Sequence, residues 1–454
     1  MKKEQLCAQH EVHAPHHLLL PQMGILVKQK YLFHIIILSL CGMTCGCMSP
    51  VNDEPTVVYH HDLSVEENVA GQAVAFQNDS TFPFLDELAQ TRSLIILGES
   101  THMDSTTQAI KTKMIMHLKQ KNFRTIFFEF GSFITMYVYT NPEYESHTGK
   151  WLFEYVFYDF NPCLQPLYDR IRNKEIKAFS IDVNAHYYDI DAIKIILNKY
   201  LKDDMLIMDW DKLKAGYARK FINPDVHDQP PMEIREQQEL MKNIDLISNY
   251  THYLIHKKGK TMDLEAVLQW IRNINTLFSF IIPVENGVNI YREAEKIALP
   301  YRNRDYQMAE NVLWLMERFP NEKAILWAAN YHGAKDISQT LYPDYPELYF
   351  IHQCAGEGLY HRLGDKLYSL AFTSLNPTFN DNPQYYQSGL FEAAIAAQTH
   401  DAPFAFVDFE HLRFADEFRD QSFEASMIGT RKKPGRWLYI FDGIYYVRDQ
   451  RVVR

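Results

Sequence analysis

The chain has 454 residues, of which 46% are hydrophobic and 14% aromatic, and this is enough for a large folded core. The formal net charge is −11, the sequence pI is about 5.9, and no basic stripe is present. We therefore exclude nucleic acid as a partner, because phosphate contacts need clustered Lys and Arg. No fixed-period repeat follows residue 50, so solenoids and propellers are excluded as well.

A secretory signal is predicted near the N-terminus. Two lysines precede an apolar run of 13 residues, 31–43, which is too short to span a bilayer and typical of a signal peptide. Small residues then lead to Cys47, which looks like the lipid-bearing cysteine of a bacterial lipoprotein, with Cys41 or Cys45 as alternatives. We expect a protein exported to the bacterial cell envelope and anchored to a membrane by lipid. A secreted or periplasmic soluble protein is the alternative.

Three segments are predicted along the chain. Residues 1–47 form an N-terminal extension with the signal peptide, 48–80 a polar tether and lead-in, and 81–454 one α/β domain. The two cysteines of that domain, Cys163 and Cys354, are interpreted as buried apolar residues. Their spacing supports neither a disulfide nor a Cys-x-x-Cys metal site.

Short apolar runs alternate with helical patterns in the domain, which is typical of βαβ units and a mostly parallel sheet flanked by helices. The runs are continuous rather than alternating, as expected for strands buried on both faces. The predicted strands are Leu94–Leu97, Thr125–Phe130, Ala178–Val183, Ala324–Ala329, Leu348–Ala355, Leu367–Thr373, Phe404–Phe409 and Leu438–Val447.

The helical patterns predict one crossover helix and one insertion. Between the first two strands, Ser105 or Thr106 is expected to cap a helix with an apolar residue at every fourth position, and Asn122 to end it. Residues 205–320 hold long helical patterns and no convincing strand. We interpret about 211–283 as a helical insertion that packs over the sheet as a wall or lid.

Polar side chains directly follow four of the predicted strands. They are Glu99 and His102, Glu129, Asp182, and Asn330 with His332. Each one alone could cap the helix after its strand. In parallel sheets, however, the carboxyl ends of the strands share the edge where ligands bind. Four polar ends with two histidines therefore favour a site at this edge.

The string Gly98-Glu99-x-x-His102 predicts catalytic chemistry. Gly98 permits a tight turn from strand to loop and a close approach of substrate to the backbone. Glu99 lies three residues before His102, so on a turn its carboxylate can orient the imidazole. An oriented neutral histidine serves as a general base near neutral pH.

Two stretches of the chain resemble the erythromycin esterase family. The first is Leu-Gly-Glu-Ser-Thr-His at 97–102, with the helix after it and the strand that ends in Glu129. The second joins Arg-Asp-Tyr-Gln-Met-Ala-Glu-Asn at 304–311 to Leu-Trp-Ala-Ala-Asn-Tyr-His at 326–332. The resemblance covers roughly 85–450. It implies an α/β core with a helical wall over a cleft, and hydrolysis of a small-molecule ester or lactone.

The resemblance also implies residue roles. His102 would activate water, aligned by Glu99, and the same site would be lined by Glu129 and His332. We assign substrate binding to the polar residues of the two stretches and of the third strand end. These are Lys111, Asp182, Arg304 and Asn330. Two positions depart from the family pattern: Lys111 stands where an Arg is common, and Ala329 where a His is usual.

Two common sequence motifs are missing from the chain. No G-x-S-x-G elbow and no glycine-rich phosphate loop occurs, so we expect neither a serine hydrolase of that kind nor a nucleotide cofactor. No cofactor is expected for the His-activated reaction.

Two alternative functions stay open. The first alternative is a metal-dependent hydrolase in which the same His and acidic side chains hold Zn or Mn. The second is a lipid-anchored binding protein without catalysis. The oligomeric state is left open.

Overall fold

The computed structural model describes residues 59–102, 104–141, 144, 162–186, 188–200, 208–221, 233–285, 294–340, 353–377, 389–418, 420–428 and 432–451. All of them lie in one compact unit, 57–454. The predictions for the signal peptide and for lipidation of Cys47 fall outside the described residues. Within the described ranges, no helix combines the length and the apolar character that a membrane crossing requires.

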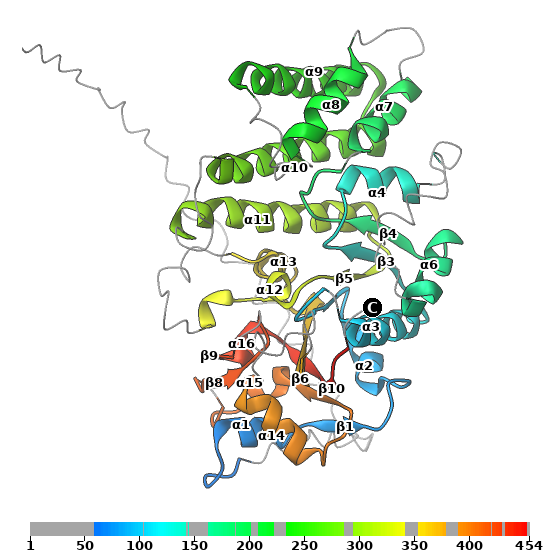
Figure 1. Ribbon diagram of the computed structural model, residues 1–454. Coiled ribbons are helices and arrows are strands. Elements are labelled where there is room, and N and C mark those ends of the chain that lie inside the picture. The colour runs from blue at the N-terminus through cyan, green and yellow to red at the C-terminus, as the bar shows by residue number, and fades with distance from the viewer. Residues whose placement is uncertain are drawn as a thin grey trace, which may run out of the picture. The chain divides into compact units, whose positions relative to one another are not determined.

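An eight-stranded sheet forms the centre of this unit (Figure 1). Its strands in spatial order are β1 (Val74–Phe76), β7 (Phe404–Asp408), β10 (Gly443–Asp449), β6 (Leu367–Asn376), β2 (Leu94–Leu97), β5 (Lys323–Trp327), β3 (Phe123–Phe128) and β4 (Lys177–Ser180). Neighbours from β10 to β4 run parallel, while β7 is antiparallel to β1 and β10. The predicted mostly parallel α/β fold is confirmed. A separate pair consists of β8 (Phe423–Ala425) and β9 (Lys433–Gly435).

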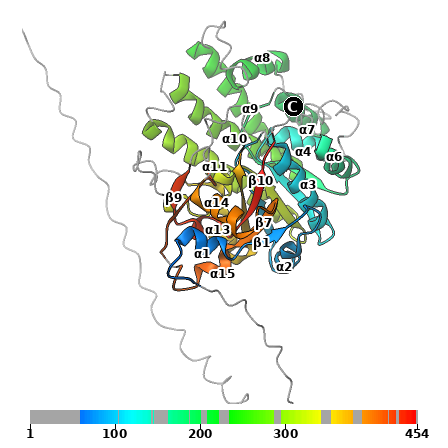
Figure 2. The ribbon, with the colours of Figure 1, turned by 60° about the horizontal axis from the view of Figure 1, so that its bottom comes forward.

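Both faces of the sheet are covered by helices. Along β2, Leu94 and Ile96 point to one face and Ile95 and Leu97 to the other, and all four are fully buried. This two-sided burial is the reason that the strand has a continuous apolar sequence. Figure 2 shows α2 and α3 on one side of the strands and α13 and α14 on the other.

The helices form three groups. The apolar cluster on the first face extends through α4 (Phe133–Thr140), α7 (Asp189–Tyr200), α8 (Trp210–Phe221), α9 (Ile234–Lys258), α10 (Met262–Glu285), α11 (Ala294–Arg318) and α13 (Ala355–Leu363). The second face packs against α2 (Pro83–Thr91), α3 (Ser105–Lys119) and α6 (Gln165–Arg172). Near β7 and β10 lie α1 (Val65–Ala70), α14 (Leu390–Gln398), α15 (Phe409–Arg413) and α16 (Trp437–Ile440). Short turns are α12 (Asn330–Gly333), η2 (Pro162–Leu164), η3 (Ile337–Gln339) and η5 (Gly364–Lys366).

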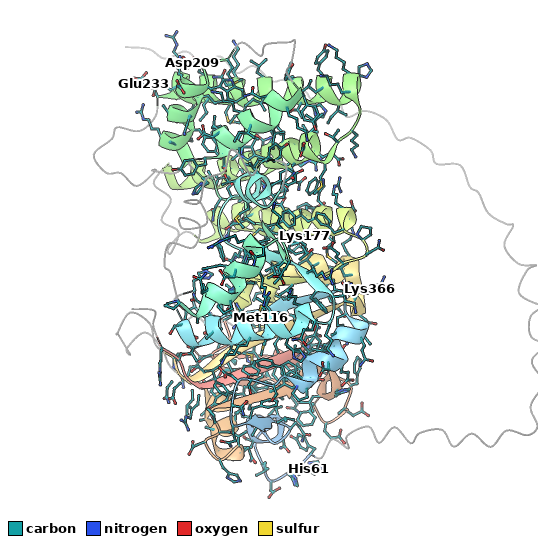
Figure 3. All side chains as sticks on the ribbon, turned by 90° about the vertical axis from the view of Figure 1, so that its right-hand side faces the viewer. His61, Met116, Lys177, Asp209, Glu233 and Lys366 are labelled. Carbon is teal, nitrogen blue, oxygen red and sulfur yellow. The ribbon has the colours of Figure 1, made fainter. Side chains whose placement is uncertain are left out.

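The predicted insertion consists of helices in the part that the structure describes, with a short non-helical link at 259–261. Helices α8, α9 and α10 share buried apolar residues such as Leu213, Ile244 and Trp270. Helix α11 continues this cluster toward the sheet. In Figure 3, Asp209 and Glu233, which precede α8 and α9, lie at the opposite end of the view from His61. The function of these helices as a lid stays a prediction.

Three predicted boundaries are wrong. The strand predicted at Leu438–Val447 begins too early, because Trp437–Ile440 is helix α16 and β10 starts at Gly443. The tether and lead-in of 48–80 is too long, because α1 and β1 belong to the fold: Val69 and Ala70 of α1 are buried, and β1 pairs with β7. The strand predicted at Leu348–Ala355 also fails at its end, since Ala355 begins helix α13. Residues 348–352 of that run lie outside the described residues. An apolar run of this length does not by itself distinguish a strand from a buried helix.

The cap predicted for the first crossover helix is corrected as well. Neither Ser105 nor Thr106 caps α3; the preceding Asp104 does, accepting hydrogen bonds from the backbone N–H of Thr106 at 2.9 Å and of Thr107 at 3.1 Å. Asn122 does adopt the left-handed conformation expected after a helix, with φ 72°. Cys163 and Cys354 form no disulfide with each other; Cys354 is buried and Cys163 half-buried.

Candidate active site

Four neighbouring parallel strands bring the predicted polar residues to one edge. In the order β2, β5, β3, β4, each strand ends at the same edge of the sheet. The segments that follow these strands are Gly98–His102, Ala328–His332, Glu129 and Ile181–Asp182. The convergence predicted from the strand ends is therefore present in the structure.

Glu99 and His102 form a dyad at this edge. The Nδ1 atom of His102 lies 2.6 Å from Glu99 Oε1. Since a carboxylate only accepts hydrogen bonds, Nδ1 carries the proton in this pair. The side chain of His102 is 62% exposed, whereas that of Glu99 is 5% exposed. The second nitrogen, Nε2, is 3.9 Å from Glu129 Oε1, which is too far for a direct hydrogen bond.

The carboxylate of Glu99 is held by two further donors. Lys111 Nζ and Trp327 Nε1 each lie 2.7 Å from Glu99 Oε2. Burial opposes ionisation of Glu99, but the charge of Lys111 and the hydrogen bond from His102 lower its pKa below the ordinary value. In turn, the hydrogen bond to Glu99 raises the pKa of His102 above 6.5. Glu99 thus stays ionised and aligns the imidazole.

His332 is a second imidazole at the site, and it is nearly buried. Its Nδ1 lies 2.6 Å from Asp305 Oδ1 and its Nε2 lies 2.9 Å from Glu129 Oε1. Burial alone would lower the pKa of His332, but the charges of Asp305 and Glu129 raise it to about 10. Both nitrogens therefore donate, and His332 is a fixed cation rather than a base.

Arg304 adds a second fixed cation. Its guanidinium binds Asp182 through Nε at 3.1 Å and Nη2 at 2.8 Å, and Nη2 is 3.8 Å from Glu129 Oε1. Its Nη1 also lies 3.2 Å from His332 Nε2, a contact between two cations that the surrounding carboxylates offset. Burial opposes ionisation of Glu129, but His332, His102 and Arg304 lower its pKa to about 2.

Three residues assigned to substrate binding are instead bonded inside the protein. Lys111 is fully buried against Glu99, and Asp182 is 1% exposed with both oxygens on Arg304. Asn330 is 1% exposed, and its Nδ2 donates to the carbonyls of Phe372 at 2.7 Å and Met427 at 2.6 Å. We correct these three assignments, because a substrate cannot reach polar groups that are buried and already paired. Arg304 is the exception: its side chain is 15% exposed.

Gly98 is needed because Asn330 lies against it. A Cβ at Gly98 would lie 2.0 Å from Asn330 Oδ1 and 3.1 Å from the Leu370 carbonyl. Asn330 cannot yield without breaking its backbone hydrogen bonds. We expect Gly98→Ala to lower the free energy of unfolding by about 3 kcal/mol, measured by urea denaturation.

The control for this substitution is Gly71→Ala. Gly71 ends α1 with φ −61°, and the nearest atom to an added Cβ lies at 3.3 Å. We expect a change within about 1 kcal/mol for the control. Equal losses in the two variants would show that the contact with Asn330 is not the cause.

Two residues of the site were not predicted. Asp305 was part of the family-like stretch, and Trp327 was part of a predicted strand, but neither was given a role. Asp305 lies three residues before the buried Met308 on one helix, so an acidic residue on a buried helical face was the signal for it. Nothing in the sequence pattern indicated that the indole of Trp327 donates to Glu99.

No group of three or more His, Cys, Asp and Glu side chains in the described part of the chain is arranged to hold a metal ion. Each imidazole directs Nδ1 to a carboxylate, His102 to Glu99 and His332 to Asp305. The geometry thus offers a base, two cations and a shared carboxylate, Glu129. This combination suits proton transfer beside a developing negative charge.

Comparison with known proteins adds a family to this geometry. The model of the family described as Erythromycin esterase matches residues 282–444. A putative hydrolase of Bacillus subtilis, YbfO, is 22% identical over 354 residues, which span 73% of this chain and 77% of that protein. A mutant of the erythromycin esterase EreC in its open conformation matches with TM-score 0.61 and 14% identity, over 84% of this chain and 98% of that one. A succinoglycan biosynthesis protein matches with TM-score 0.56 and 15% identity, over 86% and 98%.

This chain has a mostly parallel α/β sheet flanked by helices, and the proteins similar to it include a putative hydrolase and an erythromycin esterase. More narrowly, residues 282–444 match the model of the erythromycin esterase family, and the chain shares its fold with an erythromycin esterase of known structure. The resemblance inferred from the stretches at 97–102 and 304–332 is thereby confirmed.

Proposed function

We propose that the chain hydrolyses a carboxylic ester or lactone with water activated by His102. One observation carries the proposal: the 2.6 Å contact that binds His102 Nδ1 to the buried Glu99. This contact fixes the proton on Nδ1, so Nε2 of an exposed imidazole is the atom that takes a proton from water.

The reaction follows from the groups around Nε2. As water attacks the ester carbonyl carbon, Nε2 of His102 removes a proton from it. Glu129 Oε1, 3.9 Å from Nε2, is placed to hold the same water by a hydrogen bond. The carbonyl oxygen becomes an oxyanion, which the cations Arg304 and His332 stabilise. When the tetrahedral intermediate collapses, the leaving oxygen takes the proton from the imidazolium, and the products are an acid and an alcohol.

The substrate is a small molecule. The family and the match to an erythromycin esterase support a macrocyclic lactone as one candidate. Ala329 contributes only its backbone N–H, which donates to Glu129 Oε2 at 2.5 Å. Where the family usually has a second imidazole, this chain therefore has none, so smaller lactones and aryl esters belong in the same test.

The test is hydrolysis by the purified protein of a panel of aryl esters, small lactones and macrolides. We expect turnover of at least one class without a burst of the alcohol product, because no covalent intermediate forms. Loss of turnover on chelation, with recovery on adding Zn or Mn, would instead support the metal-dependent hydrolase. Binding of a lactone with no hydrolysis of any ester would support the binding protein and reject the proposal.

A further inference from the structure

Lys111 is an unusual lysine within its helix. It lies on α3 with no exposed surface, and its Nζ is 4.4 Å from the ring centroid of Trp327 and 5.9 Å from that of Phe372. The side chain of Lys113, two residues later, is 48% exposed and pairs with Asp79. A buried ammonium is costly unless a carboxylate compensates it. Lys111 has that compensation in Glu99, at 2.7 Å.

Glu99 is likewise buried and has two cations within reach. One is Lys111, and the other is His102 in its protonated form. Trp327 also donates to Glu99, but an indole carries no charge. Two further charged groups act on this cluster, Asp104 at the N-cap of α3 and Glu129 after β3, and both are acidic. If Lys111 neutralises Glu99, the imidazole is free to be neutral.

We propose that Lys111 is a positioning residue that supplies the countercharge of Glu99 at neutral pH, so that His102 can release its proton there. Lys111 does not touch the substrate. Without its charge, the buried Glu99 would be neutralised by His102, which would keep its proton and could not act as a base. The catalytic consequence rests on the proposed function, but the protonation of His102 does not.

The test is an NMR titration of the full chain labelled with ¹³C at histidine Cε1, with the His102 signal assigned by its loss in His102→Gln. We expect Lys111→Met to raise the pKa of His102 by about one unit or more. Lys111→Arg, which keeps a charge, should restore the wild-type value. The matched control is Lys113→Met, on the same helix but exposed, and it should leave the His102 titration unchanged.

A second measurement covers the case in which Lys111→Met does not fold. Burial lowers the pKa of Lys111 to about 8, against the opposing charge of Glu99. The wild-type His102 signal should therefore show a second step near this pH, and Lys111→Arg should lack it because arginine stays protonated. A wild-type curve without the second step, the same step in Lys111→Arg, or an unchanged or lowered pKa of His102 in Lys111→Met would overturn the inference. If the protein shows these pKa shifts but hydrolyses no ester, the inference about Lys111 holds and the proposed function is rejected.

Discussion

Replacing His102 by Gln is expected to reduce kcat for ester hydrolysis by about 10²- to 10⁴-fold, the contribution of a general base. The amide of Gln can still donate a hydrogen bond to Glu99, but it cannot accept a proton from water. Because the side chain of His102 is 62% exposed, the free energy of unfolding should change by no more than about 0.5 kcal/mol. The measurement pairs steady-state kinetics with urea denaturation of the same variant.

His411 provides the matched control for this substitution. It too lies three residues after an acid, with Nε2 3.5 Å from Asp408 Oδ2, and its side chain is 56% exposed. Asp408 ends β7, which is antiparallel to β10, so this pair lies at the opposite edge of the sheet from His102. His411→Gln should change kcat by less than about twofold. Retention of more than about a tenth of the activity by His102→Gln would show that another group removes the proton.

The sequence predicts the place of the site better than its internal contacts. Strands buried on both faces leave a continuous apolar run, so β2 was predicted with its observed ends, Leu94 and Leu97. A run that stops at a polar residue also locates the sheet edge, which is why Glu129 and His102 were placed together. Both inferences use local patterns that the fold preserves.

Whether a polar residue at the sheet edge is buried, and what it binds, depends on distant parts of the chain. Asn330 looks like a ligand group in the sequence, but its partners Phe372 and Met427 lie 42 and 97 residues away. Lys111 looks like a surface residue until Glu99 and the ring of Trp327 are placed beside it. No local periodicity encodes such contacts. Polar residues at the sheet edge were therefore predicted to bind substrate, although several of them are buried and bind other protein groups.

Replacing Glu129 by Gln is expected to lower the free energy of unfolding at neutral pH by about 3–5 kcal/mol, as for other buried ion pairs that lose one partner. Glu129 Oε1 faces His332 Nε2 at 2.9 Å, and Oε2 accepts from the Ala329 N–H. A Gln amide keeps the second bond, but its NH₂ would meet the N–H of His332. The buried imidazolium would then have Asp305 as its one remaining close counterion. A fall in kcat of about 10²-fold should accompany this loss, because the cations of the site lose their common partner.

The pH dependence of this loss is specific. His332 has a pKa of about 10 in the folded protein against an ordinary 6.5, so its contribution to stability is complete below pH 6.5 and is lost as pH rises to about 10. Glu129 has a pKa of about 2 against an ordinary 4.5, so its contribution is complete above pH 4.5 and is lost as pH falls to about 2. The difference in stability between wild type and Glu129→Gln should therefore be largest between pH 4.5 and 6.5 and decrease on both sides.

Urea denaturation across this pH range tests both parts, with Glu236→Gln as the control. Glu236 pairs with Arg219 at 3.1 Å, but its side chain is 45% exposed, so its loss should cost less than about 1 kcal/mol at every pH. A difference for Glu129→Gln that is small, or that stays constant from acid to alkaline pH, would mean that His332 is not held as a cation between two carboxylates. In that case His332 would be a neutral imidazole, and Arg304 alone would be left to stabilise the oxyanion.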